Sequence, residues 1–290
     1  MIETDLELVV AGDGLSEGPE WDERDDTLWW VDIVGQSVHH YDPATGTDVA
    51  FDLGQPVGAA VPRESGGLVV AIPNGFAAFD PTTGALDLIA EVEGDVPANR
   101  MNDAKCDSAG RLWGGTMSTD LTNLERGSAA LYCLDTDCSV RKVLTGVSIS
   151  NGLGWSPDDR TMYFIDTLTY GVDAFDFDVA AGTISNRRRL ITFSEPDGMP
   201  DGMTVDAEGY LWVAVFRSWV LRRFAPDGVL DAVIRLPVPQ ATSCGFAGRD
   251  KSDLYVTTYR APDTPPDSPA GGVFRCRLPI EGRTATMFRG

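Results

Sequence analysis

Short apolar runs alternate with acidic, glycine-containing turns along the whole chain, and one pattern of positions recurs. It begins with a polar residue and a glycine, continues through a short strand and an acidic turn, and ends in a second strand of bulky apolar residues. The clearest copy runs from Asp201 to Ala214, as DGMTVDAEGYLWVA. Short apolar runs bounded by turn residues are typical of β-strands, so the pattern predicts β structure.

The pattern occurs six times. Its opening pairs are Glu17-Gly18, Val57-Gly58, Asn102-Asp103, Asn151-Gly152, Asp201-Gly202 and Cys244-Gly245, and its second strands start at residues 28, 68, 112, 162, 211 and 254. These starts lie 40 to 50 residues apart, a period that suits blades of four short antiparallel strands. We therefore predict an all-β, six-bladed β-propeller that forms one domain over residues 1–290.

Both ends of the chain also resemble strands. Residues 3–10 (ETDLELVV) alternate polar and apolar positions, and residues 284–289 (TATMFR) form another strand-like stretch. Closing the ring removes exposed sheet edges. We therefore expect the two termini to complete one sheet together.

Charge and cysteine content narrow the function. The chain carries 23 Lys and Arg against 44 Asp and Glu, a net charge of −21, which argues against nucleic acid or an anionic membrane as partner. It has no apolar run of membrane-spanning length and no basic segment before an apolar one near the N-terminus. Its five cysteines are odd in number and never spaced C-x-x-C, which predicts a reduced, cytoplasmic protein. No feature indicates an oligomeric state.

The two histidines, His39 and His40, are adjacent in a predicted strand. Neighbours in a strand point to opposite faces, so they cannot form one site. Hydrolases with a Ser-His or Cys-His pair need a histidine beside the nucleophile. The sequence therefore disfavours that chemistry.

Four opening residues share one position of the repeat: Glu17, Asn102, Asn151 and Asp201. The first strand of a propeller blade lines the central channel, so we expect these side chains to meet at one end of it. Two carboxylates and two carboxamides suit a hard divalent cation. We predict one such ion, with Ca²⁺ favoured and Zn²⁺, Mg²⁺, Mn²⁺ or Fe²⁺ as alternatives. With so few protein ligands the ion would keep an open position, as catalytic metals do. Turn formation by Asp-Gly and Asn-Gly is the alternative.

The connections between second and third strands should return to the same end of the channel. The loop 117–128 and the insert 260–271 (APDTPPDSPAGG from residue 261) would then border the site, as surface loops that carry specificity often do. Arg100 and Asp120 become candidate substrate-binding residues. Solvated surface charges are the alternative for both.

Several motifs together resemble the senescence marker protein/regucalcin/gluconolactonase family. They are SEGPEWD, LWWVDI, NRMNDAKCD, GRLWGGTM, SNGLGWSPDDRTMYFIDT and PDGMTVDAEGYLWVA, and they span nearly the whole chain. The resemblance implies a six-bladed propeller with one divalent metal in its channel and hydrolysis of sugar-acid lactones. It implies that Glu17, Asn151 and Asp201 are metal ligands and that Asn102 is a ligand or a substrate contact. It makes Arg100, Asp103 and Asp120 substrate contacts, although some members have glutamate at the position of Asp120.

We therefore predict metal-dependent hydrolysis of an aldonolactone, such as glucono-, xylono-, arabinono- or galactonolactone, to the free acid. The candidate catalytic residues are Asp201, Asn102 and Asp103, with Asp201 or, second, Asp103 accepting a proton from the attacking water. One alternative is a non-enzymatic, calcium-binding regulatory protein of the regucalcin type. Another is an interaction scaffold, since fold does not imply function. A phosphotriesterase-like or strictosidine-synthase-like chemistry is a further variant.

Overall fold

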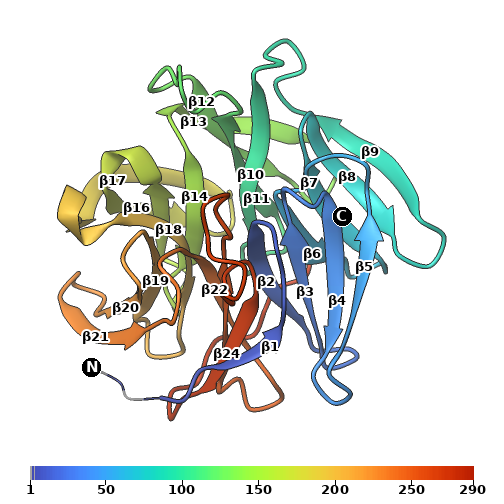
Figure 1. The fold of residues 1–290 in the computed structure, drawn as a ribbon. Coiled ribbons are helices and arrows are strands. Elements are labelled where there is room, and N and C mark those ends of the chain that lie inside the picture. Colours follow the sequence, from blue (N-terminus) through green and yellow to red (C-terminus); the bar gives the residue numbers. More distant parts are fainter. Residues whose placement is uncertain (1, 3) are drawn as a thin grey trace.

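The computed structural model describes Ile2 and residues 4–290, which form six four-stranded antiparallel sheets arranged as the blades of a propeller (Figure 1). Blade one contains β2 (Ser16–Asp22), β3 (Thr27–Asp32), β4 (Ser37–Asp42) and β5 (Thr47–Asp52). Blade two contains β6 (Ala59–Pro62), β7 (Leu68–Ile72), β8 (Gly75–Asp80) and β9 (Ala85–Glu91). Blade three contains β10 (Asn99–Cys106), β11 (Leu112–Ser118), β12 (Ala129–Leu134) and β13 (Val140–Val147).

The remaining blades follow the same order. Blade four contains β14 (Ser150–Trp155), β15 (Thr161–Asp166), β16 (Gly171–Asp178) and β17 (Thr183–Thr192), and blade five contains β18 (Met199–Val205), β19 (Leu211–Phe216), β20 (Val220–Phe224) and β21 (Leu230–Arg235). Blade six contains β22 (Ala241–Ala247), β23 (Asp253–Thr258), β24 (Val273–Arg277) and, from the start of the chain, β1 (Glu7–Val10). Two 3₁₀ turns, η1 (Thr167–Thr169) and η2 (Glu195–Asp197), flank β15 and β18. In the described part of the chain, no helix is long and apolar enough to cross a membrane.

The ring closes around the first strands, which pack against one another in the order β2, β6, β10, β14, β18, β22 and back to β2. Each predicted second strand begins within one residue of its expected position. The six-bladed propeller predicted from the repeat is thus confirmed.

The core is divided into clusters of buried apolar side chains, and each pair of neighbouring blades shares one cluster. Between blades three and four, Trp113 meets Trp155 with ring centroids 6.2 Å apart and Phe177 with centroids 5.9 Å apart. Because each cluster draws on two blades, a single blade could not bury its faces alone. The channel geometry therefore depends on the whole ring.

The acidic turns after the first strands stabilise the ends of the blades. Asp107 accepts hydrogen bonds from the backbone N–H groups of Ala109 and Arg111 at 3.0 and 3.1 Å, and from Nε1 of Trp113 at 2.9 Å. Asp206 makes the same set of contacts in blade five, including Nε1 of Trp212 at 3.0 Å. These aspartates stabilise the turns in which they lie, as expected for residues at the end of the channel opposite the predicted site.

The termini close the ring in a different way from that predicted. β1 pairs with β24 and completes blade six, as expected, but the stretch 284–289 is not a strand of that sheet. It crosses the end of the propeller instead, where Phe288 exchanges backbone hydrogen bonds with Pro62 and Glu64, and the N–H of Arg289 donates to Gly110. The reason is that β1 already occupies the last position of blade six, while the Phe288 ring is buried in the cluster between blades two and three.

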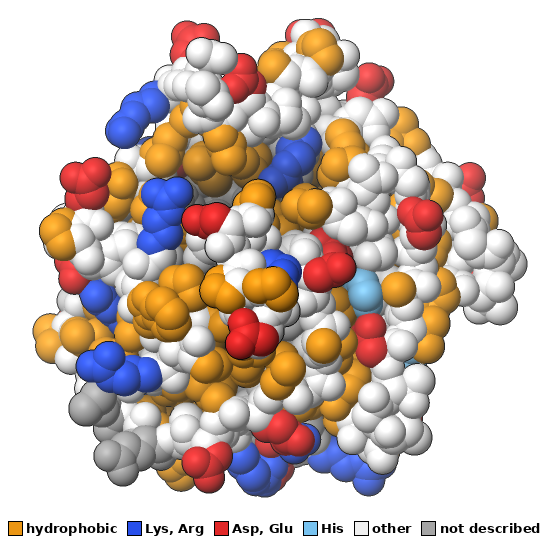
Figure 2. Space-filling model, viewed as in Figure 1, with side chains coloured by type: hydrophobic (Ala, Val, Ile, Leu, Met, Phe, Trp, Pro, Cys, Tyr) orange, Lys and Arg blue, Asp and Glu red, His pale blue; other side chains and the backbone are white. Residues whose placement is uncertain are grey.

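The surface carries its negative charge in a dispersed form. On the face seen in Figure 2, acidic and basic side chains are interspersed with hydrophobic ones. Many of the basic groups pair with nearby carboxylates, as Arg188 does with Asp176 at 2.8 Å. The net charge of −21 is therefore not gathered into one patch on this face.

The Phe288→Ala substitution tests the role of the C-terminal segment. The side chain is fully buried, and truncation of a buried phenylalanine costs about 3–5 kcal/mol of unfolding free energy. Urea unfolding should show that loss. Arg289→Ala is the control, because its side chain is exposed and its ion pair with Glu64 is long, at 3.9 Å. We expect the unfolding free energy to change by less than about 1 kcal/mol. Equal stability of Phe288→Ala and the wild type would contradict a role in ring closure.

Candidate metal and substrate site

The predicted site residues lie at β-bulges of the first strands. The pairing register shifts between Glu17 and Glu20 in blade one and between Met101 and Ala104 in blade three. It shifts again after Asn151 in blade four and after Pro200 in blade five. A bulge breaks the ladder and redirects side chains, so each shift turns polar groups out of the regular sheet and into the channel.

Blades two and six differ from this set. Blade two has no bulge between β6 and β7, and its small apolar residues bring no ligand, as expected from Val57. In blade six the register shift lies between Ala241 and Ser243, so Thr242 and not Cys244 occupies the position of Asp201. The predicted alignment was wrong by two residues, because the part of β22 that follows the register shift is two residues longer than the corresponding part of β18.

Three carboxylates form one buried cluster. Glu17, Asp103 and Asp201 are 6%, 7% and 9% exposed. Burial, followed by the charges of Asp201 and Asp103, raises the pKa of Glu17 well above 4.5. Burial and the charge of Asp103 raise the pKa of Asp201 in the same way, while the neighbouring Asn151 side chain opposes the rise. The structure therefore brings Glu17, Asn151 and Asp201 together, with Asp103 beside them.

Asn151 is held in one orientation. Its Nδ2 donates to Oγ1 of Thr167 at 3.1 Å, and that hydroxyl donates to the carbonyl of Pro200 at 2.9 Å. Its Oδ1 is buried and has no hydrogen-bond partner in Ile2 and residues 4–290. A buried acceptor without a partner is costly. Beside two carboxylates, this orphaned oxygen is suited to a cation.

Arg100 and Asn102 form a second unit at the edge of the cluster. Nη1 of Arg100 donates to Oδ1 of Asn102 and to the carbonyl of Met101, both at 2.8 Å. Nδ2 of Asn102 donates to the carbonyl of Ser150 at 2.8 Å, which ties blade three to blade four. The charge of Arg100 opposes the rise in the pKa of Glu17, while burial lowers the pKa of Arg100 itself to about 10. Asn102 thus holds the guanidinium of Arg100 at the edge of the carboxylate cluster.

Asp120 does not join the cluster. Its side chain is exposed and accepts hydrogen bonds from the N–H groups of Thr122 and Asn123, each at 3.0 Å, and from Nδ2 of Asn123 at 2.9 Å. These bonds, led by that from the Asn123 side chain, lower its pKa. The structure therefore places Asp120 within its own loop.

The insert after β23 is a pinned loop. Nη1 of Arg260 donates to the carbonyl of Ser268 at 2.8 Å, and Nη2 donates to those of Pro265 and Pro266 at 2.9 and 3.0 Å. One guanidinium thus holds several turns of a proline-rich segment. Its role as a border of the site stays a prediction.

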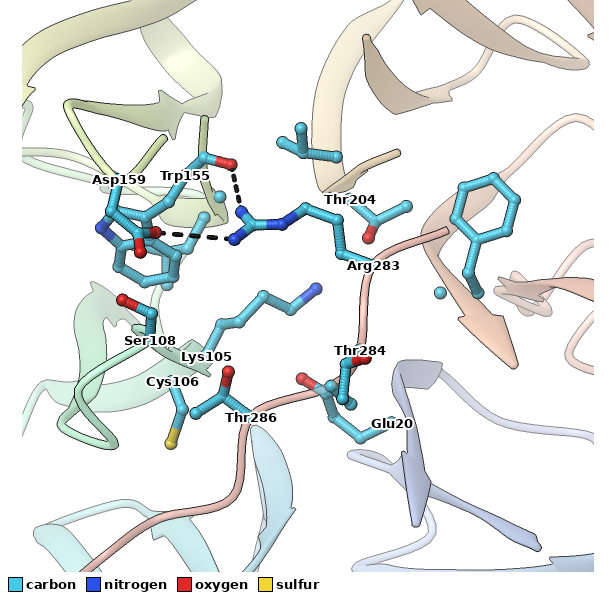
Figure 3. Close-up of a pocket in the computed structure, with 16 residues that line it drawn as sticks. Glu20, Lys105, Cys106, Ser108, Trp155, Asp159, Thr204, Arg283, Thr284 and Thr286 are labelled. Atoms are coloured by element: carbon cyan, nitrogen blue, oxygen red, sulfur yellow. Dashed lines mark hydrogen bonds and ion pairs between the residues drawn. The ribbon is translucent and has the colours of Figure 1, made fainter. Parts of the chain in front are cut away.

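The far end of the channel is covered. A cavity of about 70 Å³ lies there, lined by Glu20, Lys105 and Thr204 from the first strands and by the segment 283–286 (Figure 3). The ammonium of Lys105 donates to the carbonyl of Met203 at 3.2 Å, and Nη1 of Arg283 donates to that of Trp155 at 2.8 Å. Because the C-terminal segment crosses this end, a substrate would approach from the opposite, loop-bearing end.

Thr167 was missed in the sequence. It lies in η1, directly after β15, outside the repeated opening pair. Only its hydrogen bond with Asn151 connects it to the candidate site. No group of three or more His, Cys, Asp or Glu side chains suited to a metal is found in the described residues. The candidate ligand set differs from such a group because it contains only two carboxylates, those of Glu17 and Asp201, and the side-chain amide of Asn151.

The carboxylate cluster generates a pH prediction. Since the folded state keeps a proton on Glu17 that the unfolded state releases, ionisation lowers the unfolding free energy as pH rises from about 4.5 towards the higher folded-state pKa. Glu17→Gln removes this term. In metal-free protein, the variant should gain stability relative to the wild type as pH rises, measured by urea unfolding at several pH values with chelator present. Glu125→Gln, at an exposed loop position, should show no such trend; a flat difference for Glu17→Gln would contradict the cluster.

Comparison with known proteins agrees with this architecture. Residues 15–260 match the family described as SMP-30/Gluconolactonase/LRE-like region. The chain is 39% identical to regucalcin of Xenopus laevis over 284 residues, 95% of each chain. Two solved structures superpose with a TM-score of 0.93: a luciferin-regenerating enzyme (31% identity, covering 99% of this chain and 100% of the other) and a calcium-binding protein, regucalcin, from Agrobacterium tumefaciens (29%, covering 99% and 98%). The resemblance predicted from the motifs is confirmed, and the chain belongs to the SMP-30/gluconolactonase/LRE-like family.

Proposed function

We propose that this protein hydrolyses a sugar-acid lactone, such as glucono-, xylono-, arabinono- or galactonolactone, to the free aldonic acid, with one divalent metal ion bound by Glu17, Asn151 and Asp201. The observation that carries the proposal is the buried pair of carboxylates beside the orphaned Oδ1 of Asn151. The chain belongs to a family whose description includes gluconolactonase, and this supports lactone hydrolysis as the reaction.

The residues fit a hard cation. Glu17 and Asp201 supply two negative oxygens, and Asn151 supplies a neutral one that has no other partner. Oxygen donors of this kind suit Ca²⁺, Mg²⁺ or Mn²⁺ better than Zn²⁺. Ca²⁺ is our first choice, since the similar structure from Agrobacterium tumefaciens is called a calcium-binding protein; Fe²⁺ and Zn²⁺ remain alternatives.

The protein's own groups would bind and orient the lactone around this ion. When bound, the ion supplies Lewis-acid stabilisation of the negative charge that develops on the ester carbonyl oxygen. Arg100, fixed by Asn102, donates to substrate oxygens at the edge of the cluster. Asp201 accepts the proton of the attacking water, and Asp103 is the second carboxylate able to do so.

Asp120 remains a proposed substrate contact. To bind a sugar hydroxyl, its carboxylate would exchange its hydrogen bonds with Asn123 for bonds to the substrate. The exposed loop 119–128 makes that exchange inexpensive, because solvent reaches the side chain.

A second candidate is a calcium-binding regulatory protein without enzymatic activity. It is favoured by one observation: the curated relatives are named regucalcin. It uses the same ligands and differs only in the chemistry that follows. We also propose a cytoplasmic location, with all five cysteines as free thiols within the described chain and no nucleic acid or membrane as partner.

Metal add-back separates the two candidates. Chelator-treated protein receives Ca²⁺, Mg²⁺, Mn²⁺, Fe²⁺ or Zn²⁺ singly, and proton release from a panel of aldonolactones is followed beside the melting temperature. We expect one ion to raise the melting temperature and to restore hydrolysis above the spontaneous rate. Asp201→Asn should lose both effects, with kcat/KM at least about a hundredfold lower. A rise in melting temperature without hydrolysis would favour the regulatory protein. If no ion changes either the melting temperature or the rate of hydrolysis, the metal site is contradicted.

Thr167→Val tests the orientation of Asn151. The substitution keeps the shape of the side chain but removes the hydroxyl that holds Nδ2. Loss of a group that orients a ligand typically weakens metal affinity about 10- to 100-fold, and calorimetric titration with the active ion should show this. Thr169→Val is the matched control, because its hydroxyl donates to the carbonyl of Asp166 and not to Asn151. Unchanged affinity in Thr167→Val would contradict the ligand role of Asn151.

A further inference from the structure

Among the five blades whose first strands carry a register shift, the rim of the channel has two polar positions, on opposite sides; blade two, which has no such shift, is left out of this comparison. Two residues before each bulge residue, blades one, four and five carry Leu15, Ile149 and Met199, whereas blade three carries Arg100 and blade six carries Gln240. Arg100 and Met199 pair with Met117 and Phe216 near the ends of β11 and β19. Leu15, Ile149 and Gln240 form isolated bridges with residues at the end of a neighbouring second strand. All five therefore stand at the same, loop-bearing end of the first strands. In a six-membered ring, blades three and six face each other, so Gln240 lies across the channel from Arg100.

The backbone of Gln240 is fixed on both sides. Gln240 forms an isolated antiparallel bridge with Phe216 at the end of β19, and its carbonyl accepts from the N–H of Tyr259 at 3.0 Å. The rings of Phe216 and Tyr259 stack with centroids 6.2 Å apart and planes at 22°. The position of the Gln240 amide is thus set by β19, β22 and the residue after β23, which are rigid parts of the ring.

The side chain of Gln240 makes no hydrogen bond within the described part of the chain. Its Oε1 is buried without a hydrogen bond, and no side-chain hydrogen bond among Ile2 and residues 4–290 involves Gln240. Such a group lowers stability relative to an apolar residue of the same size. The equivalent positions in blades one, four and five show that the fold accepts apolar residues at this place.

We propose that Gln240 is a specificity-determining residue that binds a hydroxyl of a polyhydroxylated lactone, on the side of the substrate opposite Arg100. The inference rests on the proposed lactonase activity and deepens it. A side-chain amide offers both donors and an acceptor, which matches a hydroxyl group. A site with a buried polar group discriminates against an analogue that lacks the matching group, because that group is then left unpaired. Leu15, Ile149 and Met199 would face the C–H groups of the ring.

The test is the ratio of kcat/KM for δ-gluconolactone to kcat/KM for δ-valerolactone, which has the same ring without hydroxyl groups. Gln240→Met keeps the length of the side chain and removes its polar atoms. We expect the ratio to fall about tenfold, the value for one neutral hydrogen bond. Gln240→Asn, which keeps the amide but withdraws it by one methylene group, should give a smaller fall and covers the case that the methionine variant does not fold.

Lys142→Met is the control, because Lys142 is exposed on β13, the outer strand of blade three, and the change likewise replaces a long polar side chain by methionine; its ratio should equal that of the wild type. An unchanged ratio in both Gln240 variants, with the wild type active, would overturn the inference alone. A wild type that hydrolyses neither lactone with any metal would overturn the proposed activity on which the inference rests.

Discussion

The carboxylates of Glu17, Asp103 and Asp201 share one buried space, and the rest of the molecule is arranged to keep them there. Like charges in a poorly hydrated site repel each other and prefer protonation, and Arg100 alone contributes a nearby positive charge to Glu17. The cluster would separate on a flexible scaffold. It persists because the bulges belong to first strands of different blades, each packed against its neighbours through a shared apolar cluster.

The same dependence explains why the repeat predicted so much of the fold. The period of glycine, acidic turn and apolar strand follows from local structure that every blade must form, so strand starts could be placed within one residue. Asn151 and Asp201 could be found because a bulge recurs at one position of that repeat. A register shift is less visible: β22 continues for two more residues after its shift than β18 does, which moved the true equivalent from Cys244 to Thr242.

What the sequence could not provide are contacts between distant segments. Phe288 lies in a strand-like stretch, but its place was decided by an apolar cluster more than 150 residues away in the chain. Thr167 carries no motif of its own and acts through Asn151. Gln240 stands out only when its repeat position is compared with Arg100 and its unpaired amide is seen. Asp120 shows the reverse case, in which a residue predicted for the site is engaged by its own loop.

The proposed ion and the protons of the cluster would compete for the same oxygens. Burial favours the protonated carboxyl of Glu17 and of Asp201, whereas a cation requires both to be ionised. Binding of the ion would therefore release protons and strengthen as pH rises, and it would also relieve the repulsion that the metal-free cluster has to tolerate. In this view the instability of the empty cluster is the source of its affinity: the ring supplies the rigidity that prevents the carboxylates from moving apart, and the cation supplies the charge that the protein leaves out.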